Sequence, residues 1–311
     1  MPCKKPTFTA ADDIPPLTDK VILVTGGNIG LGKQCILEYA RHCPAQIWLT
    51  CRSIEKGQAA ADEIRGQVPF PVDIRLLALD LSSLDSVAKA ASVVLAEAGR
   101  LDILMLNAGI MAVPPALTVD GYEVQFGTNY MGHVLLARLL LPLLDRTASL
   151  PGADVRIVML ASDLYAAAPE PEGIRFKTLR TKAEELEANT RYGQSKLAGV
   201  LWVRTMATLY PQFTSVAIHP GIVRTNLLNG ATDLPRPLQL VAKLARPALA
   251  SIEDGVKNQL WASVAKTDIQ SGAYYTPVAV PGTLTEPAKN EMLAGQLWEW
   301  TEAELSRYVS D

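Results

Sequence analysis

A chain of 311 residues, 49% of them hydrophobic, is long enough for one large domain or two small ones around a substantial core, which excludes a disordered or fibrous protein. Its net charge of -3 provides no general positive field for a phosphate backbone, so nucleic acid is not an expected partner. Four cysteines, Cys3, Cys35, Cys43 and Cys51, have neither CxxC spacing nor a histidine cluster beside them, which favours reduced thiols in an intracellular protein over a disulfide framework or a metal site.

Residues 1–19 are expected to be an extension before the folded domain. Their lysines, aspartates and prolines leave no apolar core of the kind that a signal peptide has. The longest apolar stretch of the chain, 133–144, is too short to span a bilayer and includes Arg138. We therefore expect a soluble, cytoplasmic protein with no membrane anchor.

A glycine-rich turn follows the first predicted strand. Residues 21–25 are a continuous apolar run, typical of a buried parallel strand, and residues 33–41 have helical apolar spacing. Glycines permit positive φ angles and let a pyrophosphate approach the backbone, while the helix N-terminus supplies free N–H groups and the positive end of its dipole. A second strand at 46–51 completes the context of a dinucleotide site rather than an ordinary turn. The expected cofactor contacts are Gly26, Asn28, Ile29, Gly30, Leu31 and Gly32.

The end of the second strand is expected to select the cofactor. In such folds an acidic residue there holds the ribose 2'-hydroxyl of NAD, whereas a cation accommodates the 2'-phosphate of NADP. The sequence has Cys51-Arg52-Ser53 and no acid. Arg52 could instead be an ordinary exposed arginine at a helix start, but the missing carboxylate is separate evidence. We predict NADP or NADPH in preference to NAD.

Alternating strands and helices continue to residue 106. The predicted helices cover 54–65 and 84–98, and the predicted strands cover 73–78 and 102–106. This alternation predicts a parallel sheet with helices on both faces, whose ligands bind outside the carboxyl ends of the strands. Candidates at such ends are Asp80, Leu81 and the turn Asn107-Ala108-Gly109. Asp80 could also cap the following helix, alone or in addition.

The middle of the chain adds two polar candidates. Residues 121–144 are predicted to form one long helix, capped by Asp120 and with Asn129 at its centre. Asparagine is a mediocre helix former, so Asn129 either bonds its own helix backbone or has another function. A strand at 155–160 ends just before Ser162, at the sheet edge expected for the glycine turn. Serines often end strands, so its position alone does not make Ser162 catalytic.

Tyr192 and Lys196 lie four residues apart in a predicted helix at 192–210, so both side chains share one face. A nearby cation favours phenolate and is expected to lower the tyrosine pKa from its ordinary value of about 10. Such a tyrosine could exchange a proton near neutral pH. The alternative for this spacing is one packed ring and one solvated amine.

The last part of the chain returns to the same edge of the sheet. A strand at 214–218 is followed by His219-Pro220-Gly221, where proline and glycine force a sharp exit. Val223 and Thr225 are expected to contact the cofactor, and His219, which has no companion in the sequence, is expected to be packed or turn-bound rather than catalytic. Residues 234–250 alternate prolines with apolar residues, which indicates that 225–250 form a flap over an apolar substrate.

Three further elements are predicted at 252–264, 272–275 and 293–308, a helix, a short strand and a terminal helix. The terminal helix includes Trp298 and Trp300, which could pack on the sheet or on another subunit.

In their order and spacing these motifs resemble the short-chain dehydrogenases/reductases over residues 19–276. The matching elements are Thr25-Gly26-xxx-Gly30-x-Gly32, Asp80, Asn107-Ala108-Gly109, Asn129, Ser162, Tyr192-xxx-Lys196 and Pro220-Gly221. Within the family, the chain is similar to the retinol-dehydrogenase-like group and its fungal relatives through Cys51-Arg52-Ser53, Asn129-Tyr130-Met131-Gly132-His133 and His219-Pro220-Gly221.

The resemblance implies one NAD(P)-binding domain over residues 1–311, with a Rossmann-type α/β fold and a doubly wound parallel sheet of about seven strands. It implies that Tyr192 is the general acid/base and that Ser162 holds the substrate oxygen. Lys196 would bind the nicotinamide ribose and lower the Tyr192 pKa, and Asn129 would hold a proton-relay water. The implied activity is NADP-dependent hydride transfer to or from a carbonyl or secondary alcohol of an apolar small molecule, with fungal natural-product biosynthesis, a form of secondary metabolism, as a hint. Homodimers and tetramers are common in the family, and monomers also occur.

Two departures from the family pattern bear on the site. Ala161 precedes Ser162 where many members have a second serine, and the spacer from Ser162 to Tyr192 is longer than in the shortest members.

Two other functions remain open: a dinucleotide-binding redox sensor, whose relatives usually lack the Tyr or the Lys kept here, and a non-redox dehydratase or isomerase on the same fold. Without a membrane anchor, a retinoid substrate is not implied.

Overall fold

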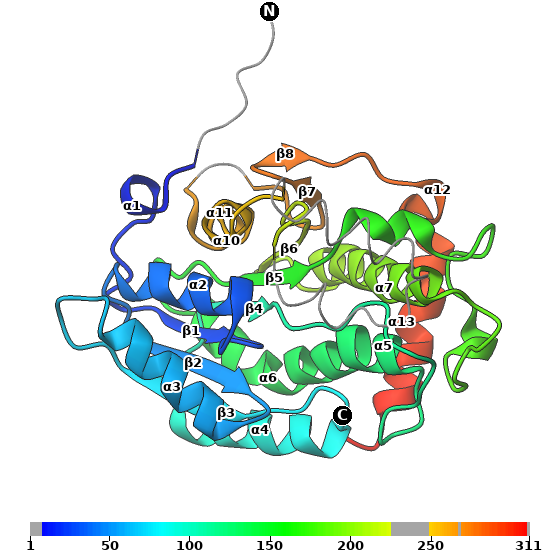
Figure 1. The fold of residues 1–311 in the computed structure, drawn as a ribbon, viewed down its shortest axis with the longest axis horizontal. Coiled ribbons are helices and arrows are strands. Elements are labelled where there is room, and N and C mark those ends of the chain that lie inside the picture. The colour runs from blue at the N-terminus through cyan, green and yellow to red at the C-terminus, as the bar shows by residue number, and fades with distance from the viewer. Residues whose placement is uncertain (1–7, 225–248, 267–268, 310–311) are drawn as a thin grey trace, which may run out of the picture.

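A computed structural model describes residues 8–224, 249–266 and 269–309. Its centre is a sheet of eight strands in the order β3-β2-β1-β4-β5-β6-β7-β8 (Figure 1). The strands are β1 (Val21–Val24), β2 (Gln46–Cys51), β3 (Ile74–Ala78), β4 (Ile103–Leu106), β5 (Arg156–Leu160), β6 (Thr214–Ile218), β7 (Tyr274–Thr276) and β8 (Val280–Pro281). The order reverses between β1 and β4, and in such sheets ligands bind at the reversal, outside the carboxyl ends of the strands.

The predicted doubly wound parallel sheet is confirmed, with one strand more than the expected seven. Strands β1 to β7 are parallel, and β8 pairs antiparallel with β7 through Tyr275 opposite Pro281. The two residues of β8 are too few to produce a period in the sequence, so only the pairing identifies this edge strand.

Helices cover both faces of the sheet. The helical segments are α1 (Ala10–Asp13), α2 (Gly30–Ala40), α3 (Ile54–Arg65), α4 (Leu84–Glu97), α5 (Val124–Phe126), the π-helical η1 (Gly127–Met131), α6 (Gly132–Ala148), the 3-10 segments η2 (Asp163–Ala167) and η3 (Phe176–Thr178), α7 (Ala188–Leu209), α10 (Ile252–Gly255), α11 (Lys257–Val264), α12 (Glu286–Lys289) and α13 (Glu291–Leu305). Leu23 of β1 packs in the core formed with α4, α6 and α7, and its neighbours Ile22 and Val24 pack in the core formed with α2, α3 and α11. Because both faces are covered, the strand is apolar at every position.

The helix predicted at 121–144, with Asp120 as its cap, is wrong at its start. Gly121 has a φ of 79°, outside the helical region, and the helix begins at Val124 with Glu123 as its N-cap. The Asp120 carboxylate instead accepts a hydrogen bond of 2.7 Å from the backbone N–H of Leu84, at the start of α4. The segment is also not one regular helix, because the π-helical η1 lies between α5 and α6.

The terminal helix α13 packs against its own chain, on α7 (Figure 1), and is bonded to α6 through Arg138. The Trp300 ring meets those of Tyr122 and Phe126 edge-on, at centroid distances of 6.2 and 5.9 Å. The Arg138 guanidinium lies 5.9 Å above the Trp298 ring and is bonded to Glu302. Both tryptophans are therefore half-buried against helical segments of their own chain, Trp298 on α6 and Trp300 on α5 and the residue Tyr122 before it, and not on the sheet.

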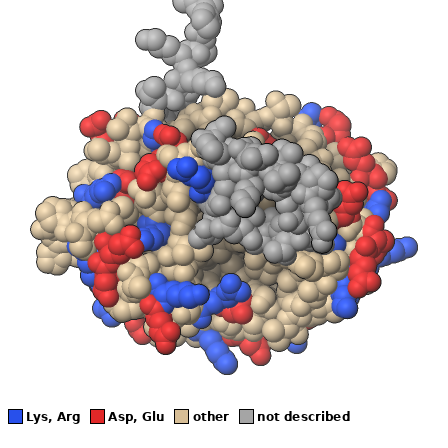
Figure 2. Space-filling model, in the orientation of Figure 1, with Lys and Arg blue, Asp and Glu red and all other residues tan. Residues whose placement is uncertain are grey.

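The described part of the N-terminal extension also belongs to the core. Phe8, Ile14 and Leu17 are buried with the side chains of α2. Among the described residues no helix is both long and apolar enough to span a bilayer. On the face drawn in Figure 2, lysines and arginines alternate with aspartates and glutamates instead of forming one basic patch.

Candidate active site

Tyr192 and Lys196 meet Ser162 at the carboxyl end of β5. Both α7 side chains are buried, with residue exposures of 3% and 5%. The Tyr192 hydroxyl is hydrogen-bonded to Ser162, and the Lys196 ammonium donates a 2.6 Å hydrogen bond to the carbonyl of Leu160, the last residue of β5. The alternative of a solvated amine is therefore excluded. Two residues of one helix and a serine thirty positions before Tyr192 thus form one cluster at the edge where ligands are expected.

Gly193, which lies between Tyr192 and Lys196 in the chain, explains how η2 comes so close to α7. A Cβ atom at Gly193 would lie 2.6 Å from the carbonyl oxygen of Leu164 and 2.8 Å from the carbonyl carbon of Ala167. Only a hydrogen fits, so η2 rests directly on α7. The Ser162 hydroxyl also accepts a hydrogen bond of 3.2 Å from the N–H of Leu164, which fixes it at the start of η2.

Burial controls the proton affinity of both α7 groups. It raises the pKa of Tyr192 to about 12, against a smaller lowering by the hydrogen bond with Ser162. It lowers the pKa of Lys196 to about 8. In the protein alone the pKa of Tyr192 is therefore raised, not lowered as expected from its spacing to Lys196. Desolvation of the phenolate is the largest effect, and the Lys196 ammonium bonds to Leu160 and lies 5.6 Å from the Tyr192 ring centroid.

Replacing Lys196 by methionine is expected to stabilise the folded protein by ~1–2 kcal/mol at pH 7, after allowance for the lost hydrogen bond to Leu160. A lysine whose pKa is lower in the folded state binds fewer protons there, so wild-type stability rises with pH from about 8 towards 10.5. Urea unfolding of both proteins at several pH values measures this. The K196M advantage should shrink above pH 8, and a variant less stable than wild type at pH 7 would contradict the assignment of a costly buried charge.

Asn129 connects the turn after β4 to α7, the helix that carries Tyr192 and Lys196. Its side-chain oxygen accepts from the N–H of Ile110 at 2.8 Å, and its amide nitrogen donates to the Ile110 carbonyl at 2.9 Å and to the Ser195 hydroxyl at 3.0 Å. Ser195 in turn donates to the Tyr192 carbonyl at 2.7 Å. The Asn129 side chain therefore bonds residues outside its own helix, contrary to the simpler alternative.

The glycine turn has the backbone that a pyrophosphate requires. Gly26 and Gly30 have φ angles of 67° and 56°, and a Cβ at Gly32 would overlap the carbonyl of Gly26. Ile29, the N-cap of α2, makes no side-chain cap, which leaves the first N–H groups of α2 available to an anion. Asn28 is half-buried and Ile29 is 51% exposed, so both residues are accessible beside the start of α2. The backbone and the accessible residues of this turn therefore fit a dinucleotide.

The turn after β4 is bonded to the glycine turn. The Thr25 hydroxyl accepts from the backbone N–H groups of Asn107 and Ala108 at 2.8 and 2.9 Å. A Cβ at Gly109 would lie 3.1 Å from the Asn129 side-chain oxygen and 3.6 Å from the Lys196 ammonium. The structure thus brings the predicted residues 107–109 next to the cluster on α7.

Asp80 has a structural partner. Its carboxylate accepts from the N–H and the hydroxyl of Ser82 at 2.9 and 2.7 Å, while Ser83 is the N-cap of α4. Asp80 therefore shapes the turn before the cap rather than capping the helix itself. Leu81 is buried, with its carbonyl against Gly132.

The other cofactor candidates lie apart from Tyr192. Arg52 is exposed after β2, two strands beyond β4 in the sheet, at the end expected to hold the adenosine half. Val223 is buried against Gly255 of α10. Thr225, and residues 225–248 of the predicted flap, lie outside the described residues.

His219 has a companion that the sequence did not reveal. Its Nε2 lies 3.3 Å from the Asp163 carboxylate, which also accepts a 2.5 Å hydrogen bond from the Tyr274 hydroxyl. Burial lowers the pKa of His219, and Asp163 opposes this shift. Asp163 directly follows Ser162 and is the first residue of η2, so its contact with His219 stabilises the start of η2. Only the adjacency of β5 and β6 brings the two residues together.

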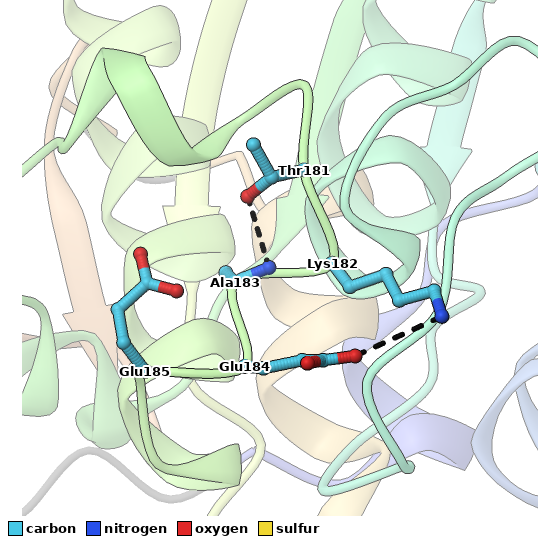
Figure 3. A pocket seen from close by; sticks show the side chains of 5 residues that line it. All are labelled: Thr181, Lys182, Ala183, Glu184 and Glu185. Carbon is cyan, nitrogen blue, oxygen red and sulfur yellow. Dashed lines mark hydrogen bonds and ion pairs between the residues drawn. The ribbon is translucent and has the colours of Figure 1, made fainter.

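A surface hollow of about 280 Å³ lies in the loop before α7, lined by residues 181–185 (Figure 3). Lys182 and Glu184 point toward each other across it at 3.7 Å, and the Thr181 hydroxyl accepts from the N–H of Ala183. Its polar groups are largely used within one loop. The cluster at the end of β5 is the stronger candidate.

Comparisons with known proteins agree with this geometry. A family model described as short chain dehydrogenase matches residues 20–167. The short-chain dehydrogenase/reductase drtF of Aspergillus calidoustus is 37% identical over 309 residues, covering 94% of this chain and 96% of that protein. Retinol dehydrogenase 13 of Homo sapiens is 36% identical, covering 93% and 84%.

Among solved structures, one from Mycobacterium paratuberculosis is 29% identical, with a TM-score of 0.72 and coverage of 96% of this chain and 97% of that one. Similarity to the curated relatives extends over nearly the whole chain and includes the segment after residue 167 that carries Tyr192 and Lys196. The chain belongs to the short-chain dehydrogenase/reductase family.

Proposed function

We propose that this oxidoreductase uses NADP to interconvert a carbonyl and a secondary alcohol on a small apolar molecule. The observation that carries the proposal is the convergence of Tyr192, Ser162 and Lys196 at the end of β5, on the same sheet edge as the glycine turn. Bound NADPH would supply the hydride for the carbonyl carbon. The chain's own residues would bind the two reactants, orient them and move the proton.

Each catalytic side chain has one task in this proposal. The Ser162 hydroxyl holds the substrate oxygen, and the Tyr192 hydroxyl, already bonded to Ser162, gives that oxygen its proton. A tyrosine whose pKa is about 12 is protonated at neutral pH, which suits the reduction of a carbonyl. Lys196 binds the nicotinamide ribose, and Asn129 holds the turn at Ile110 and a relay water. Orientation and polarisation of the carbonyl supply the remaining acceleration.

An apolar substrate is supported by two exposed hydrophobic side chains in the segments that follow β5 and β6, at the carboxyl edge of the sheet. Leu164, two residues after Ser162, is 39% exposed, and Ile222, next to Gly221, is 70% exposed. The further proposal of a step in fungal natural-product biosynthesis rests on the resemblance to fungal members of the family, one of which is similar over almost the whole chain.

We expect the purified protein to bind NADPH with micromolar affinity and NADH at least tenfold more weakly, because Arg52 replaces the acid that would hold an unphosphorylated ribose. Replacing Arg52 by alanine should weaken NADPH binding about fivefold and change NADH binding by less than about twofold, since an exposed cation contributes roughly 1 kcal/mol to a phosphate contact. Fluorescence titration with both dinucleotides measures these affinities.

The matched control is Arg75→Ala, which removes an exposed arginine of β3 that is paired with Asp73. It should leave both affinities unchanged. A preference for NADH in the wild type would reject the role of Arg52, whereas no binding of either dinucleotide would reject the enzyme proposal itself.

A further inference from the structure

His133 links the two halves of the candidate site through both of its ring nitrogens. It is 1% exposed, at the second position of α6. Its Nδ1 lies 3.0 Å from the backbone carbonyl oxygen of Asn129, and its Nε2 lies 2.9 Å from the Thr25 hydroxyl. A carbonyl can only accept, so the ring hydrogen is assigned to Nδ1. Burial lowers the pKa of His133 to about 3, so the ring is neutral and its Nε2 accepts from Thr25.

This acceptor determines how the Thr25 hydroxyl is oriented. The hydroxyl accepts from the backbone N–H groups of Asn107 and Ala108 and has one hydrogen to donate. His133 offers an acceptor at 2.9 Å, whereas the Met105 carbonyl is 3.4 Å away. Directing the hydrogen to His133 leaves the oxygen lone pairs for the turn at 107–108. The histidine thereby holds the glycine turn against the end of β4.

The other ring nitrogen acts on the catalytic side. Asn129 belongs to the π-helical η1, a departure from regular helix that often occurs at functional sites. The hydrogen bond from His133 fixes the Asn129 backbone. The Asn129 side chain bonds Ile110 and also Ser195, which lies in the turn of α7 that carries Tyr192 and Lys196. One buried ring therefore joins the cofactor turn to the proton-transfer groups.

We propose that His133 is a positioning residue: with its hydrogen on Nδ1, it holds Thr25 and Asn129 at a fixed position relative to each other. The glycine turn therefore keeps its placement relative to Tyr192 and Lys196. This rests on the proposed function for its effect on turnover. It goes beyond that function because the buried His133 ring is bonded to Thr25 and Asn129 and acts through them.

Two substitutions separate positioning from packing. His133→Gln keeps one donor and one acceptor on a neutral side chain, whereas His133→Leu keeps only the apolar volume. We expect H133L to lower kcat at least tenfold and to weaken NADPH binding three- to tenfold at temperatures well below its melting point. H133Q should restore both to within about threefold. A purely structural role would lower the melting temperature of both variants and leave the Kd for NADPH and the kcat of the folded fraction unchanged.

Thr25 provides a second test. Thr25→Val removes the shared hydroxyl and Thr25→Ser keeps it, so T25V should weaken NADPH binding and T25S should not. Adding H133L to T25V should cost less than threefold more, because both changes break the same link. Additive effects of T25V and H133L on NADPH affinity would overturn the proposal.

Nitrogen-15 NMR of the ring tests the assigned tautomer without any turnover. The chain has three histidines, so substitution identifies the His133 signals. We expect a neutral ring protonated on Nδ1 from pH 5 to 8, and a charged ring or one protonated on Nε2 would overturn the proposal. If the wild type reduces no carbonyl, the proposed function fails, while NADPH affinity and the NMR signals still decide the role of His133.

Discussion

The Tyr192→Phe protein should lose about 10²- to 10⁴-fold of its kcat for carbonyl reduction, the usual contribution of a general acid. It should bind NADPH nearly as well as the wild type. The ring is buried and phenylalanine fills the same space, so the change removes the hydroxyl and its bond with Ser162 and little else. Single-turnover kinetics with NADPH and a carbonyl substrate, together with a binding titration, separate the lost proton donor from a lost cofactor.

Tyr39→Phe is the matched control for this substitution. Tyr39 is also a buried helical tyrosine with a hydroxyl partner, Ser263, but its side chain packs in the core beside α2. That variant should keep its turnover to within about threefold, since its hydroxyl bond is worth only about 1 kcal/mol of stability. Near wild-type turnover in Y192F would rule out the proton-transfer role.

Gly193→Ala should reduce kcat about 10²-fold, because a misplacement of about 1 Å at a reacting group can cost that much. The new methyl group would meet backbone atoms of Leu164 and Ala167, which cannot rotate away, so η2 and Ser162 must shift from Tyr192. Stability should also fall by ~1–3 kcal/mol, as for other overpacked sites. Thermal unfolding and steady-state kinetics measure the two effects.

Gly199 on the same helix provides the control. A Cβ there would lie 3.2 Å from the Cγ atom of Met159, a side-chain contact that needs a shift of only a few tenths of an ångström. Alanine is favoured over glycine in a helix by about 1 kcal/mol, so G199A should be as stable as the wild type or more so and should keep its activity. If G193A behaved like G199A, the close contact between η2 and α7 would not be what positions Ser162.

Local signals predicted many elements well. The bounds of β2, α3 and β6 agree with the expected ranges to the residue, since a buried apolar run ends at a turn or a capping serine begins a helix, as Ser53 does for α3. The error at the start of the helix predicted at 121–144 also arose because that prediction used local signals alone. An apolar helical pattern does not show that Gly121 adopts a left-handed φ, nor that Asp120 is bonded to Leu84 of another helix.

The candidate site divides in the same way. The glycine turn and the pair of Tyr192 and Lys196 follow from residue types at short spacings, and these the sequence by itself determined, together with the α/β class of the fold. The assignment of Ser162 came only from the family resemblance. The side-chain bond between Thr25 and His133 and the pairing of Asp163 with His219 join residues that only the strand order brings together.

Proton affinities also belong to the tertiary structure. From spacing alone, Lys196 was expected to lower the pKa of Tyr192, but packing of α7 against β5 and η2 removes both groups from water and shifts each toward its neutral form. Desolvation depends on every segment that packs around a group, whereas spacing describes only one helix. The sequence therefore determined which groups share the catalytic face of the helix, and the tertiary structure decided their charge and their partners.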